Sequence, residues 1–362
     1  MPHGLNDTFI VLIPKLKNPE RLADLRPIAL CNVIYKIMAK AVANRLKTIL
    51  LMIISDSQSA FIQGRLITDN IVVAFEIGHF LKRKRQGRTG MATLKIDMLK
   101  AYDRLEWKFL EHMMHALGFA DSWVNLIILC VATVEYKIIQ ERHEIGPIIP
   151  ERGLRQGNPL SPYIFIICAE GLSVLLQDYE ARGRIHGYKM ARTALSISHL
   201  FFADDSFLFF KATMQESGKI KECIKLYEKA SRQFINLQKS SISFSNNTFE
   251  KQKEEICHLL QVSRTMDHGT YLGLPLLIGK NKKDVFSFIK DKALQRIQGW
   301  RKKMFSKAGK EVFLKTIVQS IPTYVMSVFL LPSLLCSELE KMMNSFWWGM
   351  NGKAHGGIRW KS

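Results

Sequence analysis

Two adjacent aspartates, Asp204 and Asp205, interrupt a run of apolar and aromatic residues that extends from His199 to Phe210. Runs of Phe and Leu of this length are typical of buried strands. A buried carboxylate needs a cation or hydrogen-bond donors, because moving an unpaired anion out of water is costly. A short Ala-Asp-Asp turn between two apolar strands would hold both carboxylates at the tip of a hairpin, where they could bind a divalent ion. The alternative is a solvated hairpin turn, since Asp also favours turns.

The composition favours a globular protein with a polyanionic partner. The chain has 362 residues, which predicts two or three subdomains, and its hydrophobic fraction of 47% argues against disorder. Lys and Arg number 52 against 32 acids, a net charge of +20. Such an excess indicates contact with nucleic acid or with an anionic membrane surface.

The sequence predicts no membrane span, secretion signal or disulfide framework. The nearest apolar stretch, Val124–Val134, is shorter than the roughly 20 residues that a bilayer requires. The N-terminus lacks a basic segment followed by an apolar one. The six cysteines are scattered without a Cys-x-x-Cys pair. We therefore expect reduced thiols in an intracellular protein of the nucleus or cytoplasm, not zinc ligands, and no membrane partner.

Basic residues concentrate in two segments. The segment from Lys280 to Lys315 holds twelve Lys or Arg and three acids, a net charge of +9 in 36 residues, and a second cluster covers residues 82–88. Each could be a solvated helix face or loop. Nearly half of the net charge in one segment is better explained by contact with phosphates. Trp300 and Phe305 lie within the first segment and could stack on bases or pack internally.

Apolar periodicity predicts an irregular alternation of strands and helices, which favours an α+β fold. Strands are expected at Phe9–Pro14, Met91–Asp97 and Ile242–Ser245. Helices are expected at about 33–51, from the spacing of Ile34, Ile37, Met38, Ala41, Val42, Ile49 and Leu50, and at about 69–84. A third helix is expected to begin at a capping box of Asp103 and Glu106 and to end at Gly118. A fourth is expected at about 163–178, with Ser161 as its cap. A fifth is indicated by the spacing of Ile220, Cys223, Ile224, Tyr227 and Phe234.

Asp97, at the end of a predicted strand, supplies a third carboxylate. If this strand neighbours the hairpin, Asp97, Asp204 and Asp205 converge at one point. Three carboxylates with open positions suit two Mg²⁺ ions, which prefer oxygen ligands and complete their shells with water or substrate phosphates. Two such ions serve in-line phosphoryl transfer, one at the attacking hydroxyl and one at the leaving pyrophosphate.

Several ordered segments resemble the motifs of reverse transcriptases from non-LTR (LINE-type) retrotransposons of plants. Lys95–Arg104 resembles their motif A, Gly153–Pro162 their motif B and Phe202–Asp205 their motif C. Further matches in the same order are Leu12–Lys15, Arg26–Leu30, Gln58–Arg65, Asn236–Ser240, Tyr271–Pro275 and Phe346–Gly349. The last of these resembles the stretch that follows the polymerase in plant elements, so the resemblance spans essentially the whole chain.

The resemblance implies an α+β right-hand polymerase with an antiparallel palm sheet packed on helices. The fingers would comprise residues 1–90, the palm residues 91–278 with an interleaved fingers segment near 119–150, and a basic helical thumb residues 279–345. Residues 346–362 would begin a truncated post-polymerase region. The implied activity is that of an RNA-directed DNA polymerase, which adds deoxynucleotides to a DNA primer on an RNA template with two Mg²⁺ ions, or with Mn²⁺ in their place.

The resemblance also implies roles for single residues. Asp97, Asp204 and Asp205 would be the catalytic metal carboxylates, with the Met98 carbonyl as an extra ligand, and Lys239 would protonate the leaving pyrophosphate. Tyr102 would exclude a ribose 2′-hydroxyl, Arg155, Gln156 and Gly157 would form the loop under the template–nucleotide pair, and Arg26 would contact the triphosphate with help from Lys15. A packed core tyrosine is the alternative for Tyr102, and a surface lysine is the alternative for Lys15 and Lys239. Asp103 is assigned to helix capping.

Some features depart from the family pattern. Asn158 stands where the family usually has Asp, and Leu99 where a small polar residue is common, which predicts impaired activity at most. The absence of an upstream endonuclease, of a Cys/His knuckle near the lone His355 and of a ribonuclease H region predicts a fragment or a degenerate copy. The alternatives to a polymerase are an inactive relic that only binds nucleic acid and an intron maturase, which shares the polymerase core. Phe346–Gly349 and the run at 64–70 favour the retrotransposon.

Overall fold

The chain divides into two units, each with its own packed interior. The computed structural model describes residues 1–2, 4–140, 143–189, 193–265, 270–278, 282–300 and 305–348. Unit 1 comprises Met1–Asn70 and His79–Met266, and unit 2 comprises Ile71–Gly78 and Asp267–Ser362. The long helix α2 (Ile67–Arg83) contributes its two ends to unit 1 and its middle to unit 2.

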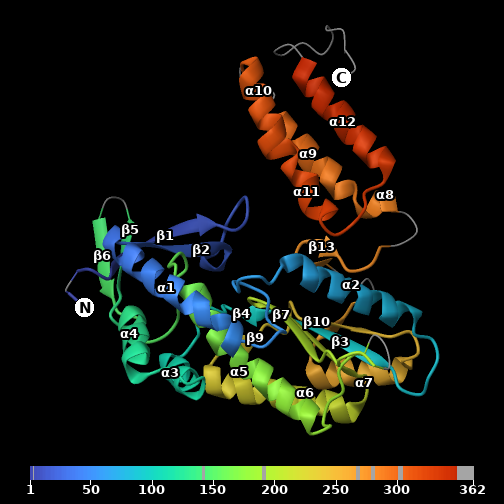
Figure 1. The fold of residues 1–362 in the computed structure, drawn as a ribbon, viewed down its shortest axis with the longest axis horizontal. Helices are drawn as coiled ribbons and strands as arrows, with labels where there is room; N and C mark the ends of the chain where they lie inside the picture. The colour runs from blue at the N-terminus through green and yellow to red at the C-terminus, as the bar shows by residue number, and fades with distance from the viewer. Residues whose placement is uncertain are drawn as a thin grey trace. The chain divides into compact units, whose positions relative to one another are not determined.

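The first part of unit 1 is a four-stranded sheet with helices packed beside it (Figure 1). The strand order is β2-β1-β5-β6; β1 pairs antiparallel with β2 and parallel with β5. The elements are β1 (Asp7–Pro14), a 3₁₀ turn (Leu22–Asp24), β2 (Leu25–Cys31), α1 (Val33–Ile53), α3 (Trp107–Ala116), α4 (Asp121–Ala132), β5 (Glu135–Gln140) and β6 (His143–Ile148). The strand expected at Phe9–Pro14 and the helix expected at 33–51 are confirmed.

The second part of unit 1 is a five-stranded sheet of order β11-β10-β3-β8-β7, with helices on one face (Figure 1). The strands are β3 (Met91–Ile96), β7 (His199–Phe202), β8 (Asp205–Lys211), β10 (Ser241–Phe244) and β11 (Ser263–Arg264). The helices are α5 (Ser161–Ala181), α6 (Met214–Ser231) and α7 (Glu250–Leu260), and a short pair is formed by β4 (Met98–Leu99) and β9 (Phe234–Ile235). The predicted hairpin around the two aspartates is confirmed, with β7 and β8 as its strands.

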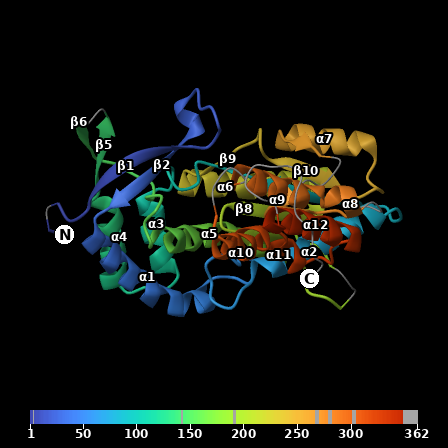
Figure 2. The same ribbon diagram turned by 90° about the horizontal axis from the view of Figure 1, so that it is seen from above.

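Helix α5 joins the two hydrophobic cores of unit 1. Thirteen of its 21 side chains are buried, so it faces protein on nearly every side. Residues Tyr163–Ala169 pack in one core with α1, α3 and α4, while Leu172, Leu176 and Tyr179 pack in the other with the five-stranded sheet and α6. In Figures 1 and 2, α5 extends from the end of unit 1 that holds α3 to the end that holds α6. Each core is therefore incomplete without this helix.

The structure corrects the expected face of α1. The helix is present, but Ile34 is 59% exposed and Ile37 is 65% exposed, and Met38 is exposed as well. The buried face instead carries Tyr35, Ala39, Ala43, Leu46 and Leu50. Small alanines let α1 approach its neighbours closely, so apolar spacing selected the wrong face in the first turns of the helix. In its later turns Leu50 is buried and Val42 and Ile49 pack partly against the core, as expected.

Two expected helix starts are also corrected. Helix α3 begins at Trp107, and its N-cap Glu106 makes no side-chain capping bond, so the predicted capping box of Asp103 and Glu106 is wrong. Helix α5 begins at Ser161 itself, so Ser161 is not its cap. The apolar residue Phe234, which was expected in the helix across Ile220 to Tyr227, lies in strand β9 after that helix has ended.

Unit 2 is mainly helical and has an aromatic interior. Its elements are β12 (Thr270–Tyr271), β13 (Leu274–Pro275), α8 (Lys282–Val285), α9 (Ser287–Trp300), α10 (Lys307–Phe313), a π-helical turn (Leu314–Val318), α11 (Ser320–Met326) and α12 (Ser333–Trp348). Trp300 stacks on Phe305 with ring centroids 5.5 Å apart, and both rings contact Phe313. Internal packing, one of the two alternatives for Trp300 and Phe305, is therefore what the structure shows.

Several cations of the basic segment have partners inside unit 2. Lys283 and Lys290 form ion pairs with Glu338, and Lys315 pairs with Glu311. Four further cations of this segment, Lys280, Arg301, Lys302 and Lys303, lie outside the described residues, as do His355 and most of the predicted post-polymerase region 346–362. Across the described ranges, no helix is both long enough and apolar enough to cross a bilayer.

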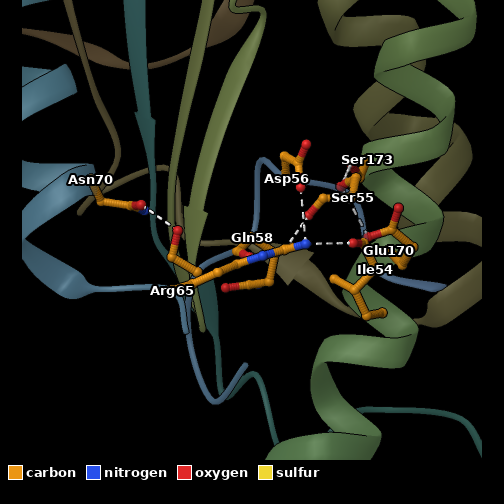
Figure 3. A network of polar contacts seen from close by, with 9 residues as sticks. Ile54, Ser55, Asp56, Gln58, Arg65, Asn70, Glu170 and Ser173 are labelled. Atoms are coloured by element: carbon orange, nitrogen blue, oxygen red, sulfur yellow. Dashed lines mark hydrogen bonds and ion pairs between the residues drawn. The ribbon is translucent and has the colours of Figure 1, made fainter. Parts of the chain in front are cut away.

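A chain of buried polar side chains lies behind β7 in unit 1. The Ser55 hydroxyl donates to Glu170 on α5 at 3.1 Å and also contacts Ser173 (Figure 3). Ser173 in turn contacts Nε2 of His199 at 2.7 Å. Burial raises the pKa of Glu170 to about 7 and lowers the pKa of His199 to about 4. Both groups are therefore held in their neutral forms by the fold over part of the acidic pH range.

Replacing Glu170 with Gln should change how stability depends on pH. Between about pH 4.5 and pH 7 the unfolded chain releases the Glu170 proton while the folded chain retains it, so the folded state loses stability as pH rises through this window. Gln cannot lose a proton and still offers an acceptor to Ser55. The free energy of unfolding of Glu170→Gln relative to the parent should therefore rise with pH, by up to about 3 kcal/mol, and level off above about pH 7.

Urea denaturation at a series of pH values measures this difference. Glu254→Gln, at an exposed position of α7, is the matched control and should show no such trend. A difference between Glu170→Gln and the parent that stays constant from pH 5 to pH 8 would contradict the assignment of a neutral, buried Glu170.

Candidate active site

The tip of the β7–β8 hairpin is a two-residue turn formed by Ala203 and Asp204. Phe202 pairs with Asp205, which closes the turn. Ala203 has a φ of +55°, in the left-handed region that a residue with a Cβ seldom adopts. A positive φ at the first central residue suits the twist of a two-residue hairpin. The turn places the Asp204 side chain in an exposed position and leaves Asp205 half-buried on the first residue of β8.

Strand pairing brings Asp97 to the same point. Strand β3 runs antiparallel to β8, with Ile96 opposite Ser206. The next step of this register sets Asp97, the residue that follows β3, opposite Asp205. Three carboxylates from two segments more than 100 residues apart thus gather at one end of the sheet.

The backbone of Asp97 is held by the loop between β9 and β10. The Asp97 N–H donates to the Ser240 hydroxyl at 3.1 Å, and the Asp97 carbonyl accepts from the Asn236 N–H at 2.8 Å. Ser240 is 1% exposed, so this contact is shielded from water. Lys239 precedes Ser240 and is exposed. The loop therefore fixes Asp97 and carries Lys239 beside it.

The loop from Gly153 to Asn158 is joined to two other segments. The N–H groups of Gly153 and Leu154 donate to the carbonyls of Leu105 and Tyr102, and the Gln156 carbonyl accepts from Ala29 on β2. A Cβ at Gly153 would lie 2.6 Å from the Asp103 carbonyl oxygen, and its φ of +88° also requires glycine. This close approach joins the loop to the segment that follows Asp97.

These segments line an open cavity of about 570 Å³, within the size range of ligand pockets. Its described lining is Arg26, Asp97, Met98, Lys100, Ala101, Tyr102, Arg155, Gln156, Gly157, Asn158, Pro159, Ser161, Pro162, Asp204 and Lys239. Nine of the eleven residues selected from the sequence are in this set. Lys15, which is exposed on the loop after β1, and Asp205 are the two outside it.

The carboxylates and Tyr102 affect one another electrostatically. Burial raises the pKa of Asp205, and the neighbouring charge of Asp204 and, more weakly, that of Asp97 raise it further, while Lys95 lowers it. Burial and the charge of Asp204 raise the pKa of Tyr102 to about 12. The Tyr102 ring stacks on Phe165 with centroids 5.0 Å apart. Tyr102 is therefore both a packed aromatic and a wall of the cavity.

The side chain of Arg155 has buried partners. Its guanidinium donates to Asn6 at 2.6 Å and to the Cys130 carbonyl at 2.8 Å, and it lies 4.1 Å from the centre of the Tyr35 ring. Arg155 is 4% exposed. These contacts bind the guanidinium within the protein interior. A direct role of Arg155 in binding a ligand stays a prediction.

Asn158 is accommodated by the same buried cluster. Its side-chain N–H donates to the Tyr35 hydroxyl at 3.2 Å, and its oxygen accepts from the Leu160 N–H. The Tyr35 hydroxyl already donates to the Cys130 carbonyl, so it can receive a hydrogen bond from an amide at position 158. Asp103, which does not cap a helix, instead accepts a bond from Gln156 at 3.3 Å.

The three aspartates do not form a ready-made metal cage. Within the described ranges, no three His, Cys, Asp or Glu side chains are arranged to hold an ion as they stand. Mg²⁺ sites in enzymes of phosphate chemistry commonly use one or two carboxylates and complete the shell with water and substrate phosphates. The oxygen donors of Asp97 and Asp204 on one cavity fit that chemistry, and the raised pKa of Asp205 indicates how closely the negative charges are crowded.

Sequence reasoning assigned no role to three residues that build the site. Lys100 lines the cavity and has a φ of +50°. Its position in the sequence between Asp97 and Tyr102 could have indicated that it lies at the site. Ser240 lay inside a recognised motif, but its bond to Asp97 spans 143 residues. Gln58 lay in another motif and contacts Ala203 across 145 residues. Contacts over such separations have no local signature.

Comparisons with known proteins point to one family. A sequence model of the family described as reverse transcriptase (RNA-dependent DNA polymerase) matches residues 13–276. The chain is 30% identical over 243 residues to the uncharacterized 149 kDa protein of transposon TX1 from Xenopus laevis, which covers 67% of this chain and 18% of that protein. It is 25% identical over 203 residues to a Pol polyprotein of the type-1 retrotransposable element R2 from Popillia japonica, covering 54% of this chain and 26% of that protein.

A solved structure shares the fold. Telomerase from Candida tropicalis, in complex with the TWJ fragment of telomeric RNA, matches with a TM-score of 0.52 at 15% identity, over 94% of this chain and 54% of that one. At this identity the likeness establishes the fold alone, and it confirms the predicted α+β right-hand polymerase. The chain spans no more than about a quarter of the two transposon proteins described above.

The contact between Ser240 and Asp97 has an internal control at the other end of β3. There the Met91 N–H donates to the Ser245 hydroxyl at 2.8 Å. Ser240→Ala and Ser245→Ala should each lower the free energy of unfolding of unit 1 by about 1–2 kcal/mol, because each leaves a backbone N–H without its acceptor. Only Ser240→Ala should accelerate hydrogen exchange at the Asp97 amide. Equal exchange at Asp97 in both variants would contradict a role of Ser240 in holding the Asp97 backbone.

Proposed function

Because the chain belongs to the reverse transcriptase (RNA-dependent DNA polymerase) family, we propose that it extends a DNA primer on an RNA template with deoxynucleoside triphosphates. The observation that carries this proposal is the single cavity lined by Asp97 and Asp204 together with Tyr102, Arg26 and Lys239. Anions for metal ions, cations for phosphates and an aromatic wall are the components that nucleotide addition requires. The relatives from transposable elements support an origin in a non-LTR retrotransposon.

Two oxygen-bound Mg²⁺ ions, or Mn²⁺, are the cofactor we propose. Asp97 and Asp204 would hold them, with Asp205 and the Met98 carbonyl as further ligands. When bound, such ions supply the positive charge that favours an ionised primer hydroxyl and neutralises pyrophosphate. The Ser240 and Asn236 contacts hold the Asp97 backbone in place for this task.

The basic side chains of the cavity suit a triphosphate. The Arg26 guanidinium is exposed on β2 and can form two parallel hydrogen bonds with phosphate oxygens. Lys239, which lines the cavity, would hold a proton near the leaving pyrophosphate, the task of a general acid. Lys100 adds a third cation at the cavity, and Lys15, outside its lining, would assist Arg26.

We propose that basic side chains of the protein bind the phosphate backbones of the template and the primer. The net charge of +20 and the RNA present in the telomerase structure support this proposal. Residues 1–90 would form the fingers, 91–278 the palm and 279–345 the thumb. The plant origin, which rests on Phe346–Gly349, and a nuclear or cytoplasmic location belong to the proposal as well.

Primer extension on an RNA template with Mg²⁺ tests the proposed activity. Asp204→Asn should lower the incorporation rate at least about hundredfold, equivalent to about 3 kcal/mol, because a neutral amide cannot replace a metal-binding carboxylate. Asp178→Asn is the matched control: its carboxylate is 40% exposed and pairs with Arg182, the residue that follows α5, and its loss should leave the rate within about twofold.

Two outcomes separate the alternatives. Undiminished incorporation by Asp204→Asn would exclude the proposed mechanism. A parent chain that binds an RNA–DNA hybrid, loses affinity as salt rises and yet incorporates no nucleotide would be a relic that only binds nucleic acid.

Tyr102 should set the discrimination between deoxyribose and ribose. Tyr102→Val shortens the wall of the cavity and should raise the incorporation of ribonucleotides relative to deoxynucleotides by about tenfold or more. Tyr102→Phe retains the ring and should keep the parent ratio. The measurement is the ratio of kcat/KM values for the two nucleotides in single-nucleotide extension. A raised ratio in the Phe variant would point to the hydroxyl and not to the ring.

A further inference from the structure

The segment from Ser55 to Arg65 lies against the outer edge of β7. Strand β7 is the last strand of its sheet, and its free edge is covered by backbone bonds from Phe201 to the Ser57 carbonyl and from Ser59 to the Phe201 carbonyl. Asn70 adds a third bond to the Phe201 carbonyl at 3.0 Å. The segment is therefore hydrogen-bonded to β7, the first strand of the hairpin that carries Asp204.

The last residue of this segment, Arg65, is bonded back to its beginning. Arg65 donates to the carbonyls of Ser55 and Gln58, each at 2.6 Å, and to the Ile54 carbonyl at the end of α1 (Figure 3). Figure 3 shows the Arg65 side chain extended between Gln58 and the residues that end α1. The Gln58 backbone is thus fixed between Arg65 and β7.

The side chain of Gln58 reaches the turn of the hairpin. Its Oε1 accepts from the Ala60 N–H at 3.0 Å and from the Ala203 N–H at 3.1 Å. Two backbone donors on one atom settle which end of the amide is oxygen. Gln58 is 1% exposed, and its Nε2 is buried without a hydrogen-bond partner in the described part of the chain. An unused buried donor is destabilising, so the contribution of this side chain rests on its oxygen.

Ala203 has a backbone conformation that such a contact can stabilise. Its φ of +55° is unfavourable for a residue with a Cβ, and it immediately precedes Asp204. A bond to its N–H opposes rotation of the turn toward a relaxed backbone, which would carry the Asp204 carboxylate away from the cavity. We propose that Gln58 is a positioning residue that holds Ala203 in its left-handed conformation and thereby aims Asp204. This inference rests on the proposed function for its catalytic consequence, but not for the conformation of the turn.

A double-mutant cycle between Gln58 and position 203 tests the proposal. Gln58→Met keeps the side-chain length and removes the acceptor, so hydrogen exchange at the Ala203 amide should rise about tenfold. The kcat for incorporation should fall about tenfold, with the KM for the primer–template nearly unchanged. Glycine adopts a positive φ without strain, so adding Ala203→Gly to Gln58→Met should restore most of kcat.

Ser59→Ala is the matched control in the same segment. It removes the bond from Ser59 to Asn70, and it should lower stability without changing exchange at Ala203 or kcat. A kcat loss in Gln58→Met that Ala203→Gly leaves uncorrected, or unchanged exchange at Ala203, would overturn the proposal. A parent without polymerase activity would refute the proposed function alone, because exchange at Ala203 would still report whether Gln58 holds the turn.

Discussion

The antiparallel register between β3 and β8 is the constraint on which the candidate active site depends. It sets Ile96 opposite Ser206 and carries Asp97 to the level of Asp205. A shift of one residue would turn every side chain of the strand to the opposite face. It would bury Lys95 and move the carboxylate out of line. The other parts of the site are attached to these two strands: the Ser240 loop through Asp97, and the Ala203 turn through β8. The chemistry of the cavity thus follows from a pairing that apolar packing on α5 and α6 stabilises.

The site balances crowded negative charge against several neighbouring cations. Burial and two neighbouring carboxylates raise the pKa of Asp205, while the cavity that Asp204 shares with Lys100, Lys239 and Arg26 offers positive charge nearby. A folded chain that keeps such groups together holds them in place through backbone bonds, because their mutual repulsion opposes the arrangement. The N–H groups of Asp97 and Ala203 donate to oxygens of two buried, uncharged side chains, Ser240 and Gln58.

Much of the architecture could be predicted, because it follows from patterns of residues that are close together in the sequence. The apolar run around Asp204 predicted the hairpin, and the ordered motifs predicted the fold and most of the cavity lining. The burial of α1 could not be predicted in this way, since its packed face uses alanines where its exposed face carries Ile34 and Ile37. The role of Arg155 was equally hidden: a basic residue beside the loop motif suggested a ligand contact, but its partners Asn6 and Cys130 come from distant segments. Residues that hold others in place through hydrogen bonds to distant segments have no characteristic spacing in the sequence.

The sharing of α5 between two cores has a consequence for how the protein comes to be folded. The residues before Ser161 include all of α1, α3 and α4, yet the core they form lacks Tyr163–Ala169 until that helix exists. The other core needs α5 and also strands and helices that follow it in the sequence. On the ribosome, a large apolar surface therefore remains open while α5 is still being synthesised, which is the condition under which chains aggregate or recruit chaperones. Once α5 is available, it completes both cores. The two halves of unit 1 therefore gain their stability together.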